Sequence, residues 1–426
     1  MRCIVLDLYV AVTADPASDV GIPLGKDRFR RGSRYRALFL TYDSFKAAFD
    51  GLVQQGYVQK VETGFRDERT GKGRVTRFRA TAKLVELITG TGKLTLARVT
   101  YRAAPDAFEP IVLRNNAKEP IEYTDTNYTT RIRGEIERIN SHLAQHWVDL
   151  YIPDTQMTEL NLRMAGDFRH KRRTASSVDF TAKRLRRIFN NEDWSQGGRF
   201  YGGWWQNIPK EYRPYIHIDD KRTIEVDYAG MHPVMMYADV GAKLIGDAYD
   251  VGLPSVPREI IKVAFNRLVN ASGRMAPEPN LTNYGISSAD LRARIVTRHQ
   301  PIARFLGTGH GILLQNLDAD IANRIMLRFY AMGYVCLPVH DSFIVHHALE
   351  DELRDIMNDE FRKRYGVDIA TKTKADGYGD TLQSVPSVVD HCPQSIEAIF
   401  AAKGPYSGYE TRWNNWNQFR HNLSGS

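Results

Sequence analysis

Two aspartates at the ends of apolar, strand-like runs are the most chemically suggestive residues in this sequence. Asp227 ends the run Thr223–Val226, and Asp341 follows shortly after the run Tyr334–Val339. A carboxylate among apolar residues is costly unless an opposite charge compensates it. Two such carboxylates from neighbouring strands suit a pair of Mg²⁺ ions about 3.5–4 Å apart, an arrangement used in phosphoryl transfer. Mg²⁺ completes its shell with water and substrate phosphates, so two protein carboxylates suffice, and Mn²⁺ favours the same oxygen ligands.

A helix-forming segment between the two aspartates carries a polar stripe. Arg258, Lys262, Asn266 and Asn270 recur every four residues and therefore share one helix face, while apolar residues such as Phe265 lie on the opposite side. Arginine grips phosphate as a fork, and lysine acts as a compact point charge. The stripe predicts a triphosphate-binding face, although by itself it also fits an ordinary amphipathic helix with solvent-facing polar residues.

Six short elements follow one another in order within residues 196–350. They are Gly198-Arg199, Gln206-Asn207-Ile208-Pro209, Asp227-Tyr228-Ala229, the pair Arg258 and Lys262, the stretch from Gln315 through Asp320, and Val339-His340-Asp341. In this order they resemble elements of the polymerase domain of family A DNA polymerases and the related single-subunit phage and mitochondrial RNA polymerases. The second element is identical to that family's QNIP sequence. The resemblance covers roughly a third of the chain.

The resemblance implies a template-directed nucleotidyltransferase that acts on a DNA template-primer and nucleoside triphosphates. It implies that Asp227 and Asp341 bind two metal ions. Lys262 would contact the triphosphate and could protonate the leaving group, and Arg258 would bind the γ-phosphate. The other implied nucleotide contacts are Asn266, Asn270, Tyr228 and His232. The implied nucleic-acid contacts are Arg199, Gln206, Asn207, Gln315 and His340.

The sequence departs from the family at positions that concern the sugar. His232 stands where family A DNA polymerases carry a glutamate that helps to exclude ribonucleotides. Asn266 and Asn270 replace an aromatic residue and a tyrosine of motif B, although Phe265 lies one residue earlier. We therefore expect relaxed or ribonucleotide-tolerant synthesis, and a primase- or RNA polymerase-like enzyme is the alternative.

Two aromatic positions near these elements each allow two interpretations. Trp204 and Trp205, directly before Gln206, could stack on bases, but their position favours packing in the core. Tyr249 and Asp250, within Gly-Asp-Ala-Tyr-Asp, could line a nucleotide pocket or form a turn before the helix that starts near Arg258.

The remaining elements must position this site and bind the nucleic acid on which it acts. Residues 44–89 predict a helix, two strand-like runs and a closing helix, an order that resembles a winged helix. Its hairpin carries eight basic and three acidic residues from Lys60 to Lys83, which suits a phosphate backbone; the alternative is a solvated hairpin. The predicted fold class is α+β, a right-hand palm with short fingers. The predicted domains are a winged-helix-like unit (1–100), a linker (101–129), a basic, helical, thumb-like region (130–195), palm and fingers (196–385) and a tail (386–426).

Composition supports a soluble protein with an acidic partner. The 426 residues carry a formal charge of +8, which favours nucleic acid over a small acidic ligand. No apolar run is long enough for a membrane span, and three distant cysteines predict neither a zinc ribbon nor a disulfide framework. We expect a cytoplasmic protein of a mobile element, whose oligomeric state the sequence leaves open. A DNA-binding replication initiator with an inactive palm and a metal-dependent nuclease are the competing hypotheses.

Overall fold

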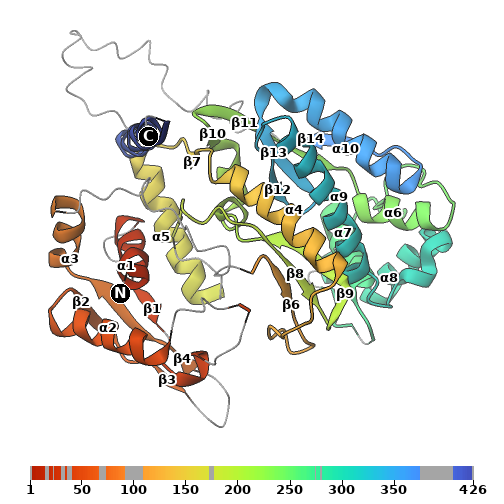
Figure 1. The fold of residues 1–426 in the computed structure, drawn as a ribbon. Coiled ribbons are helices and arrows are strands. Elements are labelled where there is room, and N and C mark those ends of the chain that lie inside the picture. Colours follow the sequence, from red (N-terminus) through yellow and green to blue (C-terminus); the bar gives the residue numbers. More distant parts are fainter. Residues whose placement is uncertain are drawn as a thin grey trace, which may run out of the picture.

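The chain folds into a small N-terminal unit beside a larger one (Figure 1). The structure is a computed structural model that describes residues 2–14, 19–22, 24–29, 34–35, 41–66, 73–91, 109–171, 177–273, 275–278, 281–374 and 406–424. Helices and strands are mixed throughout, so the predicted α+β class is confirmed. Within the described ranges, no helix combines the length and the apolar character that a membrane span requires.

The N-terminal unit has a hydrophobic core of its own. Strands β1, β5 and β2 form an antiparallel sheet in the order β1-β5-β2. Phe49 packs edge-on against Phe78 with ring centroids 4.5 Å apart, and Leu84 is buried in the same core. The helices and strands of this unit are α1 (Arg2–Ala14), β1 (Val20–Ile22), α2 (Tyr42–Gln54), β2 (Val58–Glu62), β3 (Phe65–Arg66), β4 (Gly73–Arg74), β5 (Thr76–Ala80) and α3 (Ala82–Glu86).

The predicted order of helix, hairpin and helix is therefore present, but among its described cations several arginines are paired with acids. Arg74 Nη2 lies 2.7 Å from Glu62 Oε1, and Arg79 Nη2 lies 2.8 Å from Asp19 Oδ1. Residues 67–72, which include part of the predicted basic turn, lie outside the described residues. Nucleic-acid binding by this hairpin stays a prediction.

The centre of the larger unit is an antiparallel sheet in which the order is β12-β13-β11-β10-β7, with β14 also paired to β11. The long strand β11 thus contacts three others, and the shorter strands are held by it. The bounds are β7 (Val148–Leu150), β10 (Ile216–Ile218), β11 (Lys221–Tyr228), β12 (Leu337–Val339), β13 (Ser342–His346) and β14 (Thr371–Thr373).

A second sheet, in the order β6-β8-β9, corrects the predicted linker. Strand β6 (Ile111–Leu113) runs parallel to β8 (Arg186–Asn190), which pairs with β9 (Asp193–Tyr201). All three residues of β6 are buried. Residues 109–126 therefore belong to the larger unit. The sequence predicted a linker here because a strand of three apolar residues is too short to show a period and lies among prolines.

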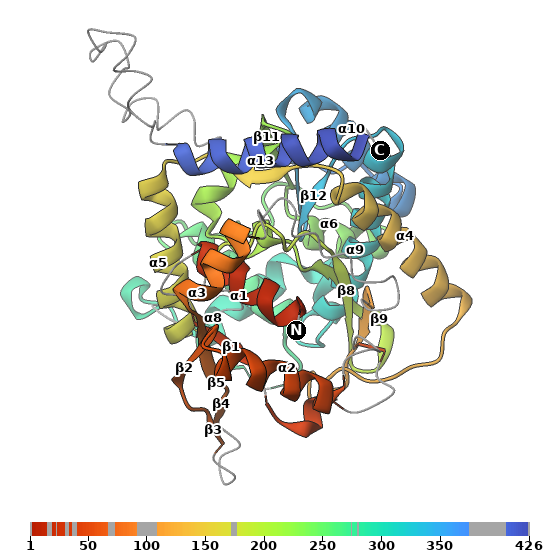
Figure 2. The same cartoon turned by 60° about the vertical axis from the view of Figure 1, so that its left-hand side comes forward.

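The predicted thumb-like region at 130–195 is also part of this unit. Helix α4 (Asn127–Leu143) packs against α9 (Gly311–Ala331), and β7 and β8 both join sheets of the larger unit. Helix α5 (Asp154–Lys171) stands between the N-terminal unit and the central sheet in the view of Figure 1 and toward the edge of the molecule in that of Figure 2.

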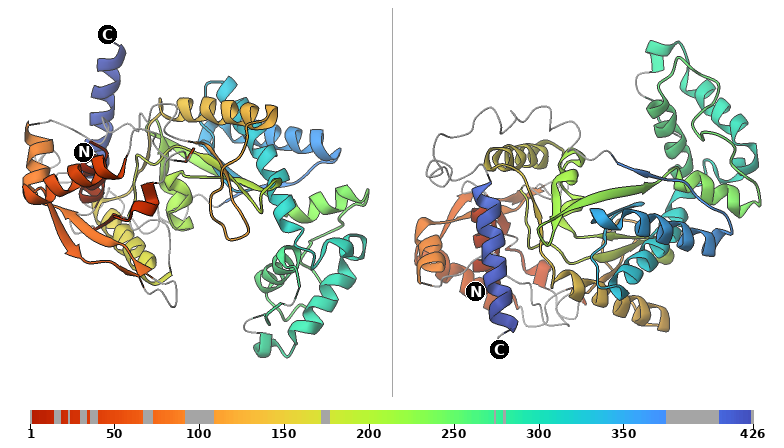
Figure 3. Two further views of the ribbon diagram at one scale, coloured as in Figure 1. Left: turned by 60° about the horizontal axis from the view of Figure 1, so that its bottom comes forward. Right: turned by 90° about the horizontal axis from the view of Figure 1, so that it is seen from above.

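A helical lobe projects from the larger unit and corresponds to the predicted fingers. Helices α7 (Arg258–Asn270) and α8 (Ser288–Arg298) pack on each other at its far end, in teal in Figure 3. Helix α6 (Met231–Asp239) follows β11 and lies at the base of the lobe. Helix α10 (Glu350–Tyr365) packs on α9 and β11.

The last helix, α13 (Ser407–Ser424), is docked rather than free. It lies across β7 and β10 (Figure 2), and Arg412 forms two hydrogen bonds of 2.7 and 2.8 Å with the buried Asp149 carboxylate. Trp147, Tyr409 and Trp416 form a separate aromatic cluster there. Residues 406–424 of the predicted tail therefore dock on the larger unit.

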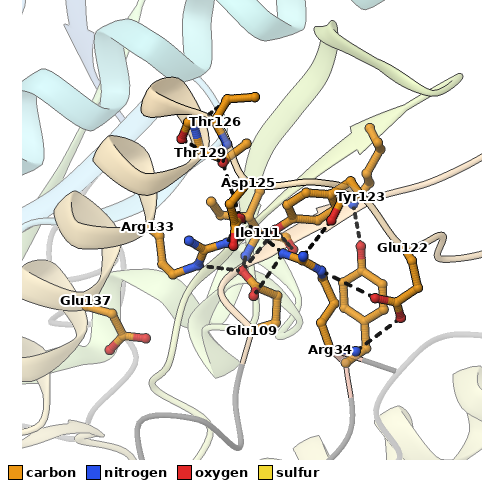
Figure 4. A network of polar contacts seen from close by, with 12 residues as sticks. Arg34, Glu109, Ile111, Glu122, Tyr123, Asp125, Thr126, Thr129, Arg133 and Glu137 are labelled. Carbon is orange, nitrogen blue, oxygen red and sulfur yellow. Dashed lines mark hydrogen bonds and ion pairs between the residues drawn. The ribbon is translucent and has the colours of Figure 1, made fainter. Parts of the chain in front are cut away.

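Arg34 connects the segment before α2 to the larger unit (Figure 4). Its guanidinium lies 3.6 Å from the centroid of the Tyr123 ring and donates to the Tyr123 carbonyl and to Asp125. Arg133 of α4 donates to the same Asp125 carboxylate at 2.6 Å and to Glu109 at 3.1 Å. Two arginines thus share one set of acids, which fixes the start of α4 and the strand that precedes it.

Candidate active site

Asp227 lies near the end of β11, and Asp341 lies in the turn between β12 and β13, at the same end of the central sheet. Asp227 pairs with Ser342 in the antiparallel register of β11 and β13. Val339 pairs with Ser342, so His340 and Asp341 form a two-residue turn, and His340 has a φ of 60°. The Tyr228 amide donates to the Asp341 carbonyl at 3.4 Å. The pairing of β11 with β13 therefore places the turn that carries Asp341 beside Asp227.

The Asp227 carboxylate is only loosely paired with cations. Its side chain is 13% exposed, and Oδ1 is buried with no hydrogen-bond partner among the described residues. The ammonium groups of Lys372 and Lys374 stay 3.7 and 3.8 Å from Oδ2. Burial, followed by the negative charge of Asp341, raises the pKa of Asp227 to about 6. A buried carboxylate oxygen without a donor beside a second carboxylate is the environment that a hard divalent cation would neutralise.

A third carboxylate, Glu225, lies on the same face of β11 but is already neutralised. It accepts hydrogen bonds from Lys374 at 2.7 Å and from Ser342 Oγ at 2.6 Å, and Arg213 Nε lies 3.0 Å away. Within the described ranges, no group of three or more His, Cys, Asp or Glu side chains is arranged to hold a metal. The residues present thus fit cations that take two protein carboxylates and fill their remaining positions with water and phosphate oxygens, as Mg²⁺ and Mn²⁺ do.

The two aspartates line a large open cavity of about 1710 Å³ between the sheet and the helical lobe. The cavity brings together all the site residues predicted from the sequence except Gln206, Asn207 and His340. The predicted residues that line it are Arg199, Asp227, Tyr228, His232, Arg258, Lys262, Asn266, Asn270, Gln315 and Asp341.

Helix α7 presents its polar stripe to this cavity, as its periodicity predicts. Ile261, Phe265 and Leu268 are buried on the other side of the helix. Lys262 forms no hydrogen bond or ion pair with any residue that the structure describes, so its ammonium group is available to a ligand. Arg258, by contrast, is paired with Asp247. The interpretation of α7 as a purely solvent-facing amphipathic helix is not needed.

A buried acid of α9 holds two of the predicted cavity residues. Asp318 accepts hydrogen bonds from Arg199 Nε at 3.1 Å and from His232 Nε2 at 2.9 Å, with His232 donating. Arg199 also feels the charge of Asp341. Sequence reasoning missed Asp318, although it follows Gln315 by three residues and thus shares its helix face.

Tyr228 corrects a prediction. Its ring is buried against Phe343 and Phe361, and its hydroxyl donates to the Met357 carbonyl at 2.6 Å. The tyrosine therefore anchors β11 to α10 and is not free to stack beneath a sugar. The alternation of side chains along β11 sends Tyr228 to the face opposite Asp227, a fact that the motif alone did not reveal.

The QNIP element supports the site from behind. Gln206 donates to the carbonyls of Phe200 and Pro338, both at 3.0 Å, and thereby joins β9 to β12. Trp205 donates to the same Pro338 carbonyl at 3.1 Å, and both tryptophans are buried, which confirms core packing. Gln206 and Asn207 lie outside the cavity lining, so their predicted contact with nucleic acid stays a prediction.

His340 lies outside the cavity lining as well, in the turn that carries Asp341. Desolvation by the surrounding protein, followed by the positive charge of Arg199, lowers its pKa. Its ring centroid lies 6.2 Å from that of Tyr201, at the end of β9. Its predicted role at the primer junction is untested.

Several cationic residues that line the cavity were not identified from the sequence. Lys372 stands opposite Asp227 in the register of β11 and β14, and Lys374 follows two residues later. The alternation Thr-Lys-Thr-Lys at 371–374 was the available signal, because it predicts a strand with both lysines on one face. Lys210, Arg213 and Lys243 add further positive charge to the wall.

Comparisons with known proteins add little. No protein-family model matches the chain, and no curated protein matches it. Among solved structures, the POL domain of Pol1 from M. smegmatis, in complex with DNA primer-template and dNTP, is a weak and partial neighbour, with a TM-score of 0.33 and 12% sequence identity over 51% of this chain. The chain spans 51% of that neighbour's length. A likeness of this strength carries no argument, and the functional case rests on the cavity.

Proposed function

We propose that this protein is a template-directed nucleotidyltransferase that adds nucleotides to a 3′-hydroxyl, in the manner of family A DNA polymerases. One observation carries the proposal: Asp227 of β11 and Asp341 of the adjacent β12–β13 turn lie in the wall of a cavity that the Arg258–Asn270 helix also lines. Acids that are 114 positions apart in the sequence and a cationic helix between them converge on one space. That convergence suits a polyphosphate substrate held against two carboxylates.

The two aspartates and the polar residues of α7 each have a defined task in this proposal. Asp227 and Asp341 would hold two divalent cations, which supply charge neutralisation and activation of the attacking hydroxyl when bound. Lys262 contacts the triphosphate and is placed to give a proton to the leaving pyrophosphate. Arg258 binds the γ-phosphate through its guanidinium. Asn266 and Asn270 continue the same face along the nucleotide.

Arg199, His232 and Gln315 form the opposite part of the proposed substrate site. Asp318 fixes the first two, so an arginine and a histidine face the space beside Asp341. We propose that Arg199 and Gln315 contact the primer-template. A histidine at position 232 in place of an acid, with asparagines at 266 and 270, supports synthesis with relaxed sugar selection.

Primer extension tests the proposal directly. The full chain is incubated with a primer-template, Mg²⁺ or Mn²⁺, and labelled dNTPs or NTPs, with and without primer. Removing one preorganised electrostatic group from an active site costs about 10²–10³ in rate, and we expect at least that loss for Asp341→Asn, with DNA binding by gel shift unchanged. Asp368→Asn is the matched control, because Asp368 lines the cavity but pairs with Arg362 instead.

Full extension by Asp341→Asn would refute the metal role. Degradation of the DNA without consumption of triphosphates would identify a nuclease. DNA binding with neither reaction would identify an initiator with an inactive palm. A strict thousandfold preference for dNTPs would contradict relaxed sugar selection without affecting the rest.

A further inference from the structure

The phosphate-binding fork of Arg258 is filled by a carboxylate of the same chain. Asp247 accepts one hydrogen bond from Arg258 Nε at 2.5 Å and another from Nη2 at 2.8 Å. Both residues line the cavity, and the guanidinium also lies 4.7 Å from the centroid of the Tyr249 ring. Hydrogen bonding by Arg258 holds the pKa of Asp247 below its usual range, so the acid is charged whenever it faces the arginine.

Asp247 is held in place by contacts that do not involve Arg258. In its loop, residues 245–250, the Ile245 and Asp250 carbonyls accept hydrogen bonds from Arg298 of α8, and the Ala248 carbonyl lies 2.7 Å from His299 Nε2. Asp247 Oδ1 also accepts from the Tyr249 amide at 3.2 Å. The loop can therefore keep its conformation when Arg258 moves to another partner.

The ion pair is open to exchange. The Arg258 side chain is 52% exposed and that of Asp247 is 39% exposed, and exposed pairs contribute little because water screens them. Arg258 is the first residue of α7, so its side chain can turn without disturbing the helix core. The edge of the guanidinium that Asp247 occupies is the Nε–Nη2 edge, one of the two edges that a phosphate can take as a bidentate ligand.

We propose that Asp247 is an internal competitor for Arg258 that makes triphosphate binding an exchange of anions and favours highly charged phosphates over singly phosphorylated ligands. The inference rests on the proposed function in one respect, that the cavity receives a nucleoside triphosphate. To bind Arg258, a ligand must displace the Asp247 carboxylate and then stay bound close to that negative charge. A triphosphate does so through several oxygens at once with Lys262, whereas a monophosphate gains less from the same exchange.

The test is calorimetric titration of the full chain with inorganic tripolyphosphate and with orthophosphate. Asp247→Asn keeps the Oδ1 acceptor for the Tyr249 amide and removes the charge. An exposed ion pair is worth about 0.2–1 kcal/mol, which corresponds to an affinity change of up to about fivefold. We expect Asp247→Asn to bind tripolyphosphate about two- to fivefold more tightly and to lose part of the preference over orthophosphate.

Two variants isolate the effect. Glu259→Gln removes a charge next to Arg258 from a side chain that is 74% exposed and 3.7 Å from Arg258 Nη1, so it controls for general repulsion. Arg258→Gln combined with Asp247→Asn completes a double-mutant cycle, in which the gain must vanish. The proposal is overturned if Asp247→Asn binds more weakly, which would make Asp247 a positioning residue, if Glu259→Gln gives the same gain, or if no form binds tripolyphosphate. These titrations need no catalysis, so a failure of nucleotide addition is a separate result.

Discussion

Asp318 is a buried carboxylate that serves two cavity side chains at once. Arg199 comes from β9 and His232 from the start of α6, and both donate to this acid on α9. Three elements distant in the sequence therefore meet at one charge. Without it, an arginine and a histidine would face each other with their nitrogens 3.3 Å apart.

Neutralising Asp318 should destabilise the fold as well as loosen the site. Breaking a buried ion pair by removing one partner costs about 3–5 kcal/mol, and partial exposure of Arg199 places Asp318→Asn near the lower end. Urea denaturation measures the free energy of unfolding. Asp355→Asn, an exposed acid of α10, is the control and should change little. Equal stability of the two variants would show that Asp318 is not the anchor.

Residue-level prediction from the sequence succeeded where spacing alone decides which side chains share a face. The stripe on α7 and the two strand-end aspartates are found in one cavity, as predicted. It failed where the answer depends on contacts with distant residues. Nothing around Tyr228 in the sequence shows that α10 covers it, and nothing near Asp318 shows that Arg199 will reach it.

Helix α13 depends on polar and aromatic contacts with β7 and β10. Tyr409 donates to Asp220 at 2.6 Å and lies 3.3 Å from His217 Nδ1, and the Tyr151 ring stacks on His217. Burial lowers the pKa of His217 to about 4. The histidine is thus neutral beneath the helix at neutral pH.

Docking of α13 should therefore weaken in acid. The window runs from about pH 6.5, the ordinary histidine pKa, down to about pH 4, the pKa of folded His217. Within it the unfolded chain binds a proton at this histidine that the folded chain does not. The contribution of His217 to stability therefore falls as the pH drops through the window and is constant above it. Tryptophan fluorescence follows the change through Trp413 and Trp416. His217→Gln removes the titrating ring and should flatten the profile; an unchanged slope would assign the acid response to other groups.

At the level of elements, the sequence predicted those in which apolar residues recur with a period or form a continuous run. Helices α2 and α7 and strand β11 lie where these patterns place them, and β12 lies within the run Tyr334–Val339. Strands β6 and β7 have three residues each, too few for a period to be visible, and their sheet partners are far away in the sequence. For that reason the predicted linker contains β6 and the predicted thumb-like region contains β7, although both strands belong to sheets of the larger unit.

In the part of the chain that the structure describes, the two largest hydrophobic cores are separate. One lies within the N-terminal unit, around Phe49 and Phe78, and the other fills the larger unit. Chains with more than one core commonly unfold in more than one step. The Arg34 contacts join the units through polar groups, which couple them more weakly than shared apolar packing would.

Calorimetry should consequently resolve two transitions. Phe49→Ala removes a buried aromatic ring, at a cost of about 3–5 kcal/mol, and should lower the melting temperature of the N-terminal transition alone. Phe329→Ala, in the other core, should shift the second transition and leave the first. A single transition that moves as a whole in both variants would show that the two cores unfold together.

Strand β7 ends the central sheet on one side, and within the described ranges it pairs with β10 alone. An unpaired strand edge is a template on which a second molecule can add a strand, and such additions lead to aggregation. Here the edge is three residues long, and α13 lies across it through Arg412 and Asp149 (Figure 2). This edge therefore leaves almost no backbone accessible to a strand of a second molecule, so the docked helix also protects the protein against edge-to-edge association.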